Sequence, residues 1–254
     1  GHLEEPPRVD EARHQLWIGA GPGSLWSLDT RDGSVLWHQD LGHLDATPLV
    51  HDDVLYVPAQ KSETLNESFF YALNAKNGEI LWKLDQPGQP WGSPILHKNG
   101  KIVLTTTGIG QIGVQRDTDK GWAYGVSLEG KILWQTQLPD MAVSSDIYLP
   151  DQDIIIYVAK NGSVIALNAS DGSRIWETKA GVSFYAPGVL VTRFRETLLA
   201  VMATDGVFSL INAHTGEIAF TYKRGERSRA APLVHGDIIY IATDFGIAAI
   251  GEKQ

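Results

Sequence analysis

The chain reads Leu28-Asp29-Thr30-Arg31-Asp32-Gly33-Ser34-Val35-Leu36-Trp37 over residues 28–37, and this ten-residue phrase decides the fold because it returns. Clear copies occupy residues 73–82 and 167–176, and weaker copies end at Trp134 and Phe220. The closing aromatic residues therefore follow one another after about 42 to 52 residues, a period that is typical of propeller blades. The sequence predicts a repeat protein.

The phrase has the composition of a hairpin. An aliphatic residue ends one strand, an Asp or Asn starts a turn, a glycine takes a positive φ, and a second strand begins. Each repeat divides in this way into four short strands. We expect an all-β propeller of about six four-stranded blades, five of them complete and the sixth, from Pro232 onward, lacking its last strand. Residues 1–254 should form a single domain, with residues 1–7 as a tag or tail.

Composition excludes several classes of function. The formal net charge of −9 argues against a general affinity for nucleic acid or anionic membranes. The chain has no cysteine, which excludes disulfides, thiolate catalysis and cysteine metal sites. It also has no run of about eighteen apolar residues, so no membrane span is expected. The spacing of the eight histidines does not indicate a zinc site.

Two segments carry a family pattern. One is Gly162-Ser163-Val164-Ile165-Ala166-Leu167-Asn168-Ala169-Ser170-Asp171-Gly172 followed by Trp176, and the other is Tyr71-Ala72-Leu73-Asn74-Ala75 followed by Trp82. Small residues and a proline open most repeats, as at Pro48 and Pro94. The chain resembles the PQQ-like, or quinoprotein-like, β-propeller family from about residue 15 to residue 250. That family includes quinoprotein alcohol and glucose dehydrogenases, the propeller lipoprotein of the outer-membrane assembly machine, and sensor domains of receptor kinases.

The repeated aromatic residues are predicted to be structural. The resemblance implies that such side chains dock between neighbouring blades, where burial of a large ring stabilises each junction by a few kcal/mol. The docking set is Trp37, Trp82, Trp134, Trp176 and Phe220.

Positions that depart from the repeat are the better candidates for binding. The residue just before each small-small-Pro opening varies sharply, and the loop over residues 223–229 is locally basic. We expect a ligand or partner to contact Asp45, Trp91, Phe184, Arg227 and Arg229. Insertions over residues 60–68 and 106–121 should rise on the same axial loop face. The alternative interpretation of the basic loop is an ordinary solvated segment.

The expected function is a non-enzymatic scaffold that binds a protein or peptide partner, or a small ligand, at its axial loop face. It would act in the periplasm or outside the cell, as in cell-envelope assembly. One alternative is a dehydrogenase-like protein that binds pyrroloquinoline quinone with Ca²⁺, and another is the extracellular sensor domain of a larger receptor. Asp146, which replaces the proline of a repeat opening, is one unusual carboxylate, whereas a Ca²⁺ site needs six or more oxygen ligands. No catalytic residue, metal ligand or cofactor is predicted, and the oligomeric state is left open.

Overall fold

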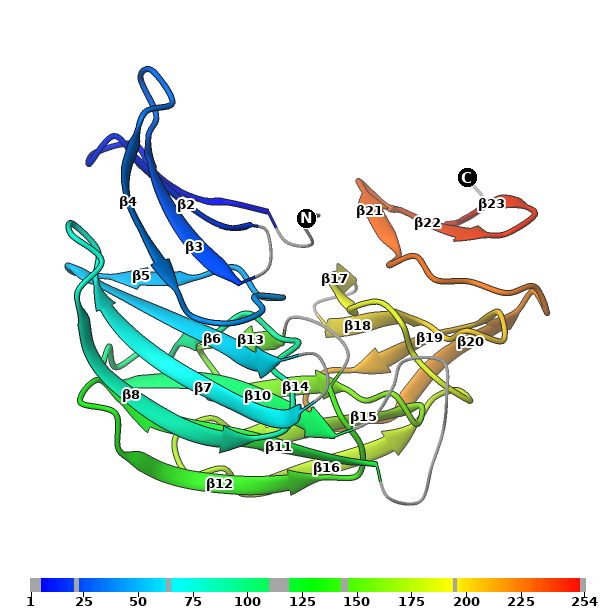
Figure 1. The fold of residues 1–254 in the computed structure, drawn as a ribbon. Helices are drawn as coiled ribbons and strands as arrows, with labels where there is room; N and C mark the ends of the chain where they lie inside the picture. The colour runs from blue at the N-terminus through cyan, green and yellow to red at the C-terminus, as the bar shows by residue number, and fades with distance from the viewer. Residues whose placement is uncertain are drawn as a thin grey trace. The chain divides into compact units, whose positions relative to one another are not determined.

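The regular elements of the protein are antiparallel β-strands. In the computed structural model, the described residues are 6–20, 23–62, 65–109, 119–142, 146–193 and 196–251. Their strands form five four-stranded sheets and one three-stranded sheet (Figure 1). This confirms the predicted all-β class, including the sixth sheet with three strands. None of these residues belongs to a helix that could cross a membrane.

The chain falls into two compact units. The first unit comprises residues 1–109 and 121–137, and the second comprises residues 110–120 and 138–254. Each unit contains three sheets, which we number in chain order.

The first unit contains sheets 1 to 3. Sheet 1 consists of β1 (Arg8–Asp10), β2 (Gln15–Ala20), β3 (Ser24–Asp29) and β4 (Val35–Asp40). Sheet 2 consists of β5 (Leu49–His51), β6 (Val54–Ser62), β7 (Leu65–Asn74) and β8 (Ile80–Pro87). Sheet 3 consists of β9 (Ile95–Leu96), β10 (Ile102–Ile109), β11 (Lys120–Ser127) and β12 (Ile132–Leu138).

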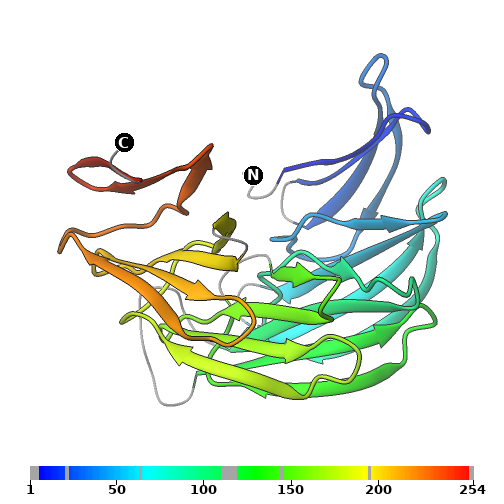
Figure 2. The ribbon, with the colours of Figure 1, turned by 180° about the vertical axis from the view of Figure 1, so that it is seen from behind.

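The second unit contains sheets 4 to 6, seen from behind in Figure 2. Sheet 4 consists of β13 (Ile147–Leu149), β14 (Ile154–Val158), β15 (Ser163–Asn168) and β16 (Arg174–Lys179). Sheet 5 consists of β17 (Val189–Arg193), β18 (Glu196–Met202), β19 (Val207–Asn212) and β20 (Ile218–Lys223). Sheet 6 consists of β21 (Leu233–His235), β22 (Ile238–Thr243) and β23 (Gly246–Ile250).

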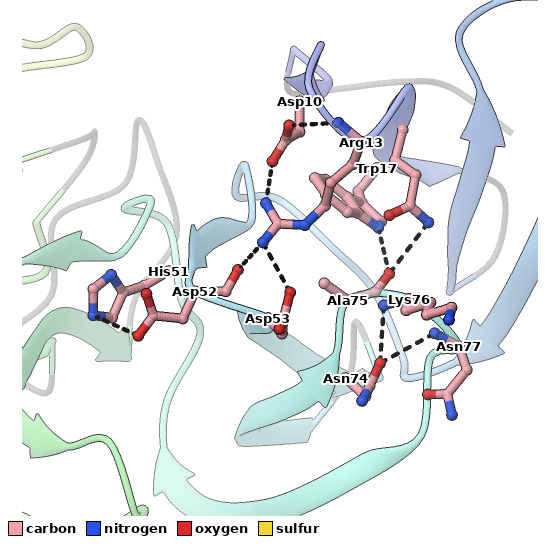
Figure 3. Close-up of polar contacts among 11 residues, drawn as sticks. Asp10, Arg13, Trp17, His51, Asp52, Asp53, Asn74, Ala75, Lys76 and Asn77 are labelled. Carbon is pink, nitrogen blue, oxygen red and sulfur yellow. Dashed lines mark hydrogen bonds and ion pairs between the residues drawn. The ribbon is translucent and has the colours of Figure 1, made fainter.

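The repeated phrase folds as its residues predict. In sheet 2, Asn74 Oδ1 accepts hydrogen bonds from the backbone N–H groups of Lys76 and Asn77 at 2.9 and 3.3 Å (Figure 3). The N–H of Gly78 returns to the Asn74 carbonyl at 2.8 Å, with a φ of 74° at the glycine. This is an Asx-type turn in which the glycine takes the conformation that other residues adopt at a cost.

Burial follows the position of a strand within its sheet. All five residues of β14 are buried, whereas the fourth strand β16 alternates between exposed and less exposed residues. The second and third strands thus supply most of the core. Between sheets 1 and 2, for example, Trp17 and Leu25 pack with Leu55 and Leu73. Removal of these apolar side chains from water is the main force that holds neighbouring sheets together.

Tryptophans of the fourth strands reach the next sheet within each unit. The Trp37 indole N–H donates to the Ala75 carbonyl at 3.2 Å, and Trp82 donates to Leu128 at 2.7 Å. In the second unit Trp176 donates to Ala213 at 3.3 Å. Trp134 is also buried. Phe220 is 42% exposed and lies edge-on to Phe208 of its own sheet, with ring centroids 6.4 Å apart. The stabilising role of the five aromatic residues stays a prediction.

The turn glycine forms the other half of this contact. A Cβ at Gly78 would lie 2.6 Å from the Trp37 ring, and one at Gly130 would lie 2.8 Å from the Trp82 ring. A Cβ at Gly216 would lie 2.7 Å from Trp176. At Gly33 nothing lies within 4 Å. The indole therefore sits directly on a glycine that the turn requires for a separate reason, its positive φ.

A polar junction supplements the apolar contact between sheets 1 and 2. Arg13 forms ion pairs with Asp10 and Asp53, the latter at 2.9 Å, and also donates to the Asp52 carbonyl (Figure 3). Hydrogen bonds from Arg13 lower the pKa of Asp10. Trp17 donates to the same Ala75 carbonyl as Trp37, at 3.3 Å. Because the ion pairs are partly exposed, we assign most of the stability of the junction to its apolar contacts.

The first predicted insertion is mainly a longer hairpin. Strand β6 extends to Ser62 and β7 starts at Leu65, with these two residues opposite each other. The expectation of a loop over residues 60–68 is therefore corrected, because the inserted residues extend the two paired strands β6 and β7. In the second insertion, β10 extends to Ile109 and β11 begins at Lys120, while residues 110–118 lie outside the described part of the chain.

Candidate binding site

The predicted site residues share one end of their sheets. A crossover segment leads from the fourth strand of one sheet to the first strand of the next, and it pairs with the end of the second strand of that next sheet. The bridges are His43 with Gln60, Gln89 with Gly108, Ala142 with Ala159, and Phe184 with Ala203. We call this part of each sheet, together with the end of its fourth strand, the crossover end.

In the first unit, Asp45 and Trp91 lie in the crossover segments before sheets 2 and 3. Asp45 is 7% exposed, and its Oδ1 lies 2.6 Å from His43 Nε2, so its carboxylate is already in contact with a polar group in the structure. Trp91 is half-buried, and its indole N–H is buried without a hydrogen-bond partner. Whether either residue contacts a partner stays a prediction.

In the second unit, the crossover before sheet 5 contains Phe184 and Tyr185. Phe184 is 1% exposed, so its ring is part of the core and can support a surface without forming it. Tyr185 is 41% exposed, and the Arg229 guanidinium lies 5.3 Å from the centroid of its ring. A cation over an aromatic face at this distance is attractive. The structure thus brings Arg229 to an aromatic residue, but to the neighbour of the predicted one.

The basic loop is held in place by its own polar residues. Arg224 Nε donates to Glu226 at 2.6 Å, and Thr243 Oγ1 donates to the same carboxylate at 2.5 Å. These bonds, first the one from Thr243 and then the one from Arg224, lower the pKa of Glu226. Ser228 is buried and donates to the Ala242 carbonyl at 2.7 Å. Arg224 is therefore neutralised within the loop.

Arg227 and Arg229 flank the buried Ser228 and are exposed. Neither forms an ion pair with a carboxylate of the described residues. Two guanidinium groups on a fixed loop can bind an anion without first breaking a salt bridge. The arginines were found from the sequence, whereas Tyr185 was missed; its position directly after Phe184 was the only signal.

A buried charge cluster was also missed. Lys160, just after β14, is 1% exposed, pairs with Asp119 and lies 3.9 Å from Asp140 Oδ1. Asp140 Oδ1 accepts the Met141 N–H at 2.7 Å. Asp119 immediately precedes β11, so the lysine fixes the end of the second insertion. The sequence does not indicate that Lys160 is buried, because lysine is almost always exposed unless it is paired.

Buried polar atoms without a hydrogen-bond partner gather at the crossover ends. Within the described ranges, and setting aside Asp45 with its ion pair, they belong to Gln86, Trp91, Thr105, Thr106, Asp146, Tyr157 and Asp205. Trp91 and Asp146 lie in crossover segments, Gln86 and Tyr157 lie near the ends of β8 and β14, and Asp205 lies in the turn after β18. Thr105 and Thr106 lie in the middle of β10. Such atoms are uncommon in folded proteins because each loses its bonds to water.

The comparisons with known proteins agree with the strand pattern. A family model described as outer membrane protein assembly factor BamB matches residues 6–128 and 119–253. The chain belongs to this family of PQQ-like β-propellers. The repeats read from the sequence are therefore propeller blades, and the predicted family is confirmed.

Individual relatives of the family are distant. Tetrathionate hydrolase of Acidithiobacillus ferrooxidans is 22% identical over 85% of this chain and 49% of its own length. Outer membrane protein assembly factor BamB of Shewanella oneidensis is 27% identical over 67% of this chain and 42% of its own length. The chain thus spans about half the length of the curated relatives it matches.

A solved structure supports the fold. That of a europium-containing methanol dehydrogenase superposes with a TM-score of 0.77 at 13% identity, over 98% of this chain and 67% of the other. This likeness concerns the propeller fold, which hosts many functions. The described residues contain no group of three or more His, Asp or Glu side chains placed to hold a metal ion.

Proposed function

We propose that this propeller is a non-enzymatic scaffold that binds an extended segment of a protein partner at its crossover ends during outer-membrane protein assembly, in the periplasm. The proposed role in outer-membrane protein assembly is supported by membership of the family described as assembly factor BamB and by the similarity to the Shewanella oneidensis protein. The observation that carries the binding site is the position of the buried polar atoms without partners, because most of their residues, namely Gln86, Trp91, Asp146, Tyr157 and Asp205, lie at crossover ends.

In the second unit the recognition surface would consist of Tyr185, Arg227 and Arg229. The tyrosine offers a large, rigid face at low entropic cost, and the arginines offer forked donors for carboxylates. Aromatic residues and arginine are also the side chains most often found as binding hot spots. We therefore propose that the bound segment carries at least one Asp or Glu near an apolar residue. The buried Phe184 would hold in place the crossover segment that presents Tyr185.

In the first unit the groups are of mixed character. Trp91 has an N–H donor, Gln86 has both a donor and an acceptor, and Thr105 has a hydroxyl that can serve as either. Peptide groups present the same mixture of donors and acceptors. We propose that this crossover end binds the backbone of a partner segment. Asp45, held by His43, would be a charged residue at the neighbouring crossover.

The experiment compares charge reversal at two places. A photo-crosslinking residue at position 229 should capture an outer-membrane assembly protein in cell envelopes, identified by mass spectrometry, whereas the same residue at position 174 should not. Arg229→Glu should weaken binding of the captured protein at least ten-fold with the melting temperature nearly unchanged. Arg174→Glu makes the same charge change at the start of β16, which is the end of the strand opposite to the crossover end, and it should leave binding intact.

Trp91→Phe tests the first unit in the same assay, because it keeps an aromatic ring and removes the indole N–H. A loss of binding without a loss of stability supports the proposal. If Arg229→Glu binds as tightly as the unmodified protein, or if it lowers the melting temperature as much as it lowers binding, the proposed surface is wrong.

A further inference from the structure

Asp146 and Tyr157 form an unusual pair on sheet 4. In the register of β13 and β14, Ile147 lies opposite Ile156, and continuing this register by one residue toward the crossover end places Asp146 opposite Tyr157. The Asp146 charge contributes to the raised pKa of Tyr157, as expected for neighbours. Directly opposed residues of an antiparallel pair extend from the same face of the sheet. The carboxylate and the phenol are therefore cross-strand neighbours.

Neither side chain has a hydrogen-bond partner within the described part of the chain. Both carboxylate oxygens of Asp146 and the hydroxyl of Tyr157 are buried without a hydrogen bond, and Tyr157 is 0% exposed. A buried carboxylate without a counter-ion is among the most costly arrangements in a folded protein. The fold does not require it, because the other repeats with a small-small opening have a proline at the position of Asp146. These prolines are Pro48, Pro94, Pro187 and Pro232.

We propose that Asp146 and Tyr157 are a binding site for a primary ammonium group. The two carboxylate oxygens and the phenol oxygen are three acceptors on one face of the sheet, and an ammonium group has three N–H donors and one positive charge. A divalent cation such as Ca²⁺ takes six or more oxygens, twice what this pair supplies. The ammonium group can belong to a small free amine or to a lysine side chain.

The electrostatics of the pair are consistent with this ligand. Burial raises the pKa of Asp146 well above its usual range. Burial and the neighbouring Asp146 charge raise the pKa of Tyr157 well above its usual range. Among the described residues, Tyr157 on β14 is the titratable group whose pKa responds to the Asp146 charge. A raised pKa favours the protonated carboxyl group in the absence of a cation, so ammonium binding should be accompanied by proton release.

The test uses methylammonium chloride with the whole chain and compares it with tetramethylammonium chloride, which has the same charge but no N–H donor. Methylammonium should raise the melting temperature saturably, and tetramethylammonium should not. Isothermal titration calorimetry in two buffers of different ionisation enthalpy should show the release of a proton. A peptide with one internal lysine, titrated in parallel, distinguishes a lysine side chain from a free amine.

Three variants decide the role of the residues. Asp146→Asn should weaken methylammonium binding at least ten-fold, and Tyr157→Phe should weaken it several-fold because one acceptor is lost. Asp151→Asn, an exposed residue at the other end of the same hairpin, should bind as the unmodified protein does. An equal response to the two salts, or unchanged binding in Asp146→Asn, would overturn the proposal. This site does not depend on the partner surface proposed above, because the readout is amine binding alone.

Discussion

Gly78 illustrates how much one residue can be required to do. Its φ of 74° favours glycine, and its missing side chain leaves room for the Trp37 ring, which would lie 2.6 Å from an added Cβ. Gly33 has the same φ of 74°, but nothing lies within 4 Å of its Cβ position. The two positions therefore separate backbone strain from steric contact.

We expect Gly33→Ala to cost about 1–2 kcal/mol, the strain of a left-handed conformation. Gly78→Ala should cost roughly 1–3 kcal/mol more, because the indole must also move. Urea unfolding of the two variants measures the difference. Equal losses would show that the ring adapts freely and that the glycine is needed only by the turn.

Asp146 should make stability depend on pH. Its native pKa is raised above the ordinary value of 3.8, so its contribution is fully present below that pH and is lost as the pH rises through the native pKa. Asp146→Asn cannot lose a proton there. In amine-free buffer the variant should match the unmodified protein near pH 3.5 and exceed it at pH 7. Each tenfold difference between the native and unfolded acid dissociation constants corresponds to about 1.4 kcal/mol of this gain.

Urea titrations at the two pH values check this expectation. Asp151→Asn, at the exposed turn of the same hairpin, serves as the control. A variant that is less stable at pH 7 would mean that the ionised carboxylate has a stabilising partner.

Single residues also show what could not be predicted from the sequence, namely which side chain of a crossover segment is exposed. Arg227 stands out because its loop is basic and Arg229 because it departs from the repeat, and the structure shows both to be exposed. Phe184 stands out for the same reason but is buried, while Tyr185 is exposed. In a regular strand the alternation of side chains fixes which neighbour faces outward. The crossover is irregular, so the sequence offers no period from which to choose.

At the level of strands, the docking aromatic residues differ in their surroundings. Trp176 is buried and bonded to the Ala213 carbonyl, whereas Phe220 is 42% exposed. Trp176→Ala should therefore cost about 3–5 kcal/mol, and Phe220→Ala should cost clearly less. Chemical denaturation followed by circular dichroism compares the two. A negligible loss for Trp176→Ala would contradict its docking role.

The buried cluster around Lys160 links an insertion to the sheets of the second unit. Lys160→Met removes the cation and leaves Asp119 and Asp140 close together in the interior. We expect a loss of about 3–5 kcal/mol, the usual cost of breaking a buried ion pair from one side. Lys131→Met, at an exposed turn position, is the control. A loss below about 1 kcal/mol would show that the aspartates are solvated without the lysine.

Strands were easier to predict than loops. The Asx residue and glycine of each phrase specify a hairpin locally, so the strands around Gly78 and Gly172 follow from their neighbours in sequence. Residues 60–68 are polar and were expected to form a loop, yet β6 and β7 continue into them. Their strand conformation comes from pairing across the hairpin, which depends on partners more than on propensity.

For the whole molecule, the period of the repeat is sufficient to identify the propeller, because every copy has a glycine turn followed by a closing aromatic residue, which is Trp in four copies and Phe220 in the last. The function was less accessible. Asp146 stands out in the sequence because it replaces a proline of the repeat, but its burial is visible only in the structure. Lys160 is recognisable only when its partners are known, since the sequence shows the residue but not its surroundings.

A titration with pyrroloquinoline quinone and Ca²⁺ tests the enzymatic alternative. We expect no saturable quenching of the eight tryptophans and no dye-linked oxidation of alcohols. The reason is that a calcium-bound quinone needs many convergent oxygens. Calcium-dependent quenching at micromolar quinone, together with turnover, would contradict the proposed scaffold role.

The contact between tryptophan and glycine has an evolutionary consequence. Both halves lie in one ten-residue phrase: Gly78 receives the ring of Trp37, and Trp82 of the same copy is received by Gly130. A gene segment that encodes one repeat therefore encodes both the tryptophan that packs on the next repeat and the glycine that receives the tryptophan of the preceding repeat. Duplication of such a segment yields a new blade that already fits its neighbours on either side. Blade number can change by recombination, with no interface to be invented afresh.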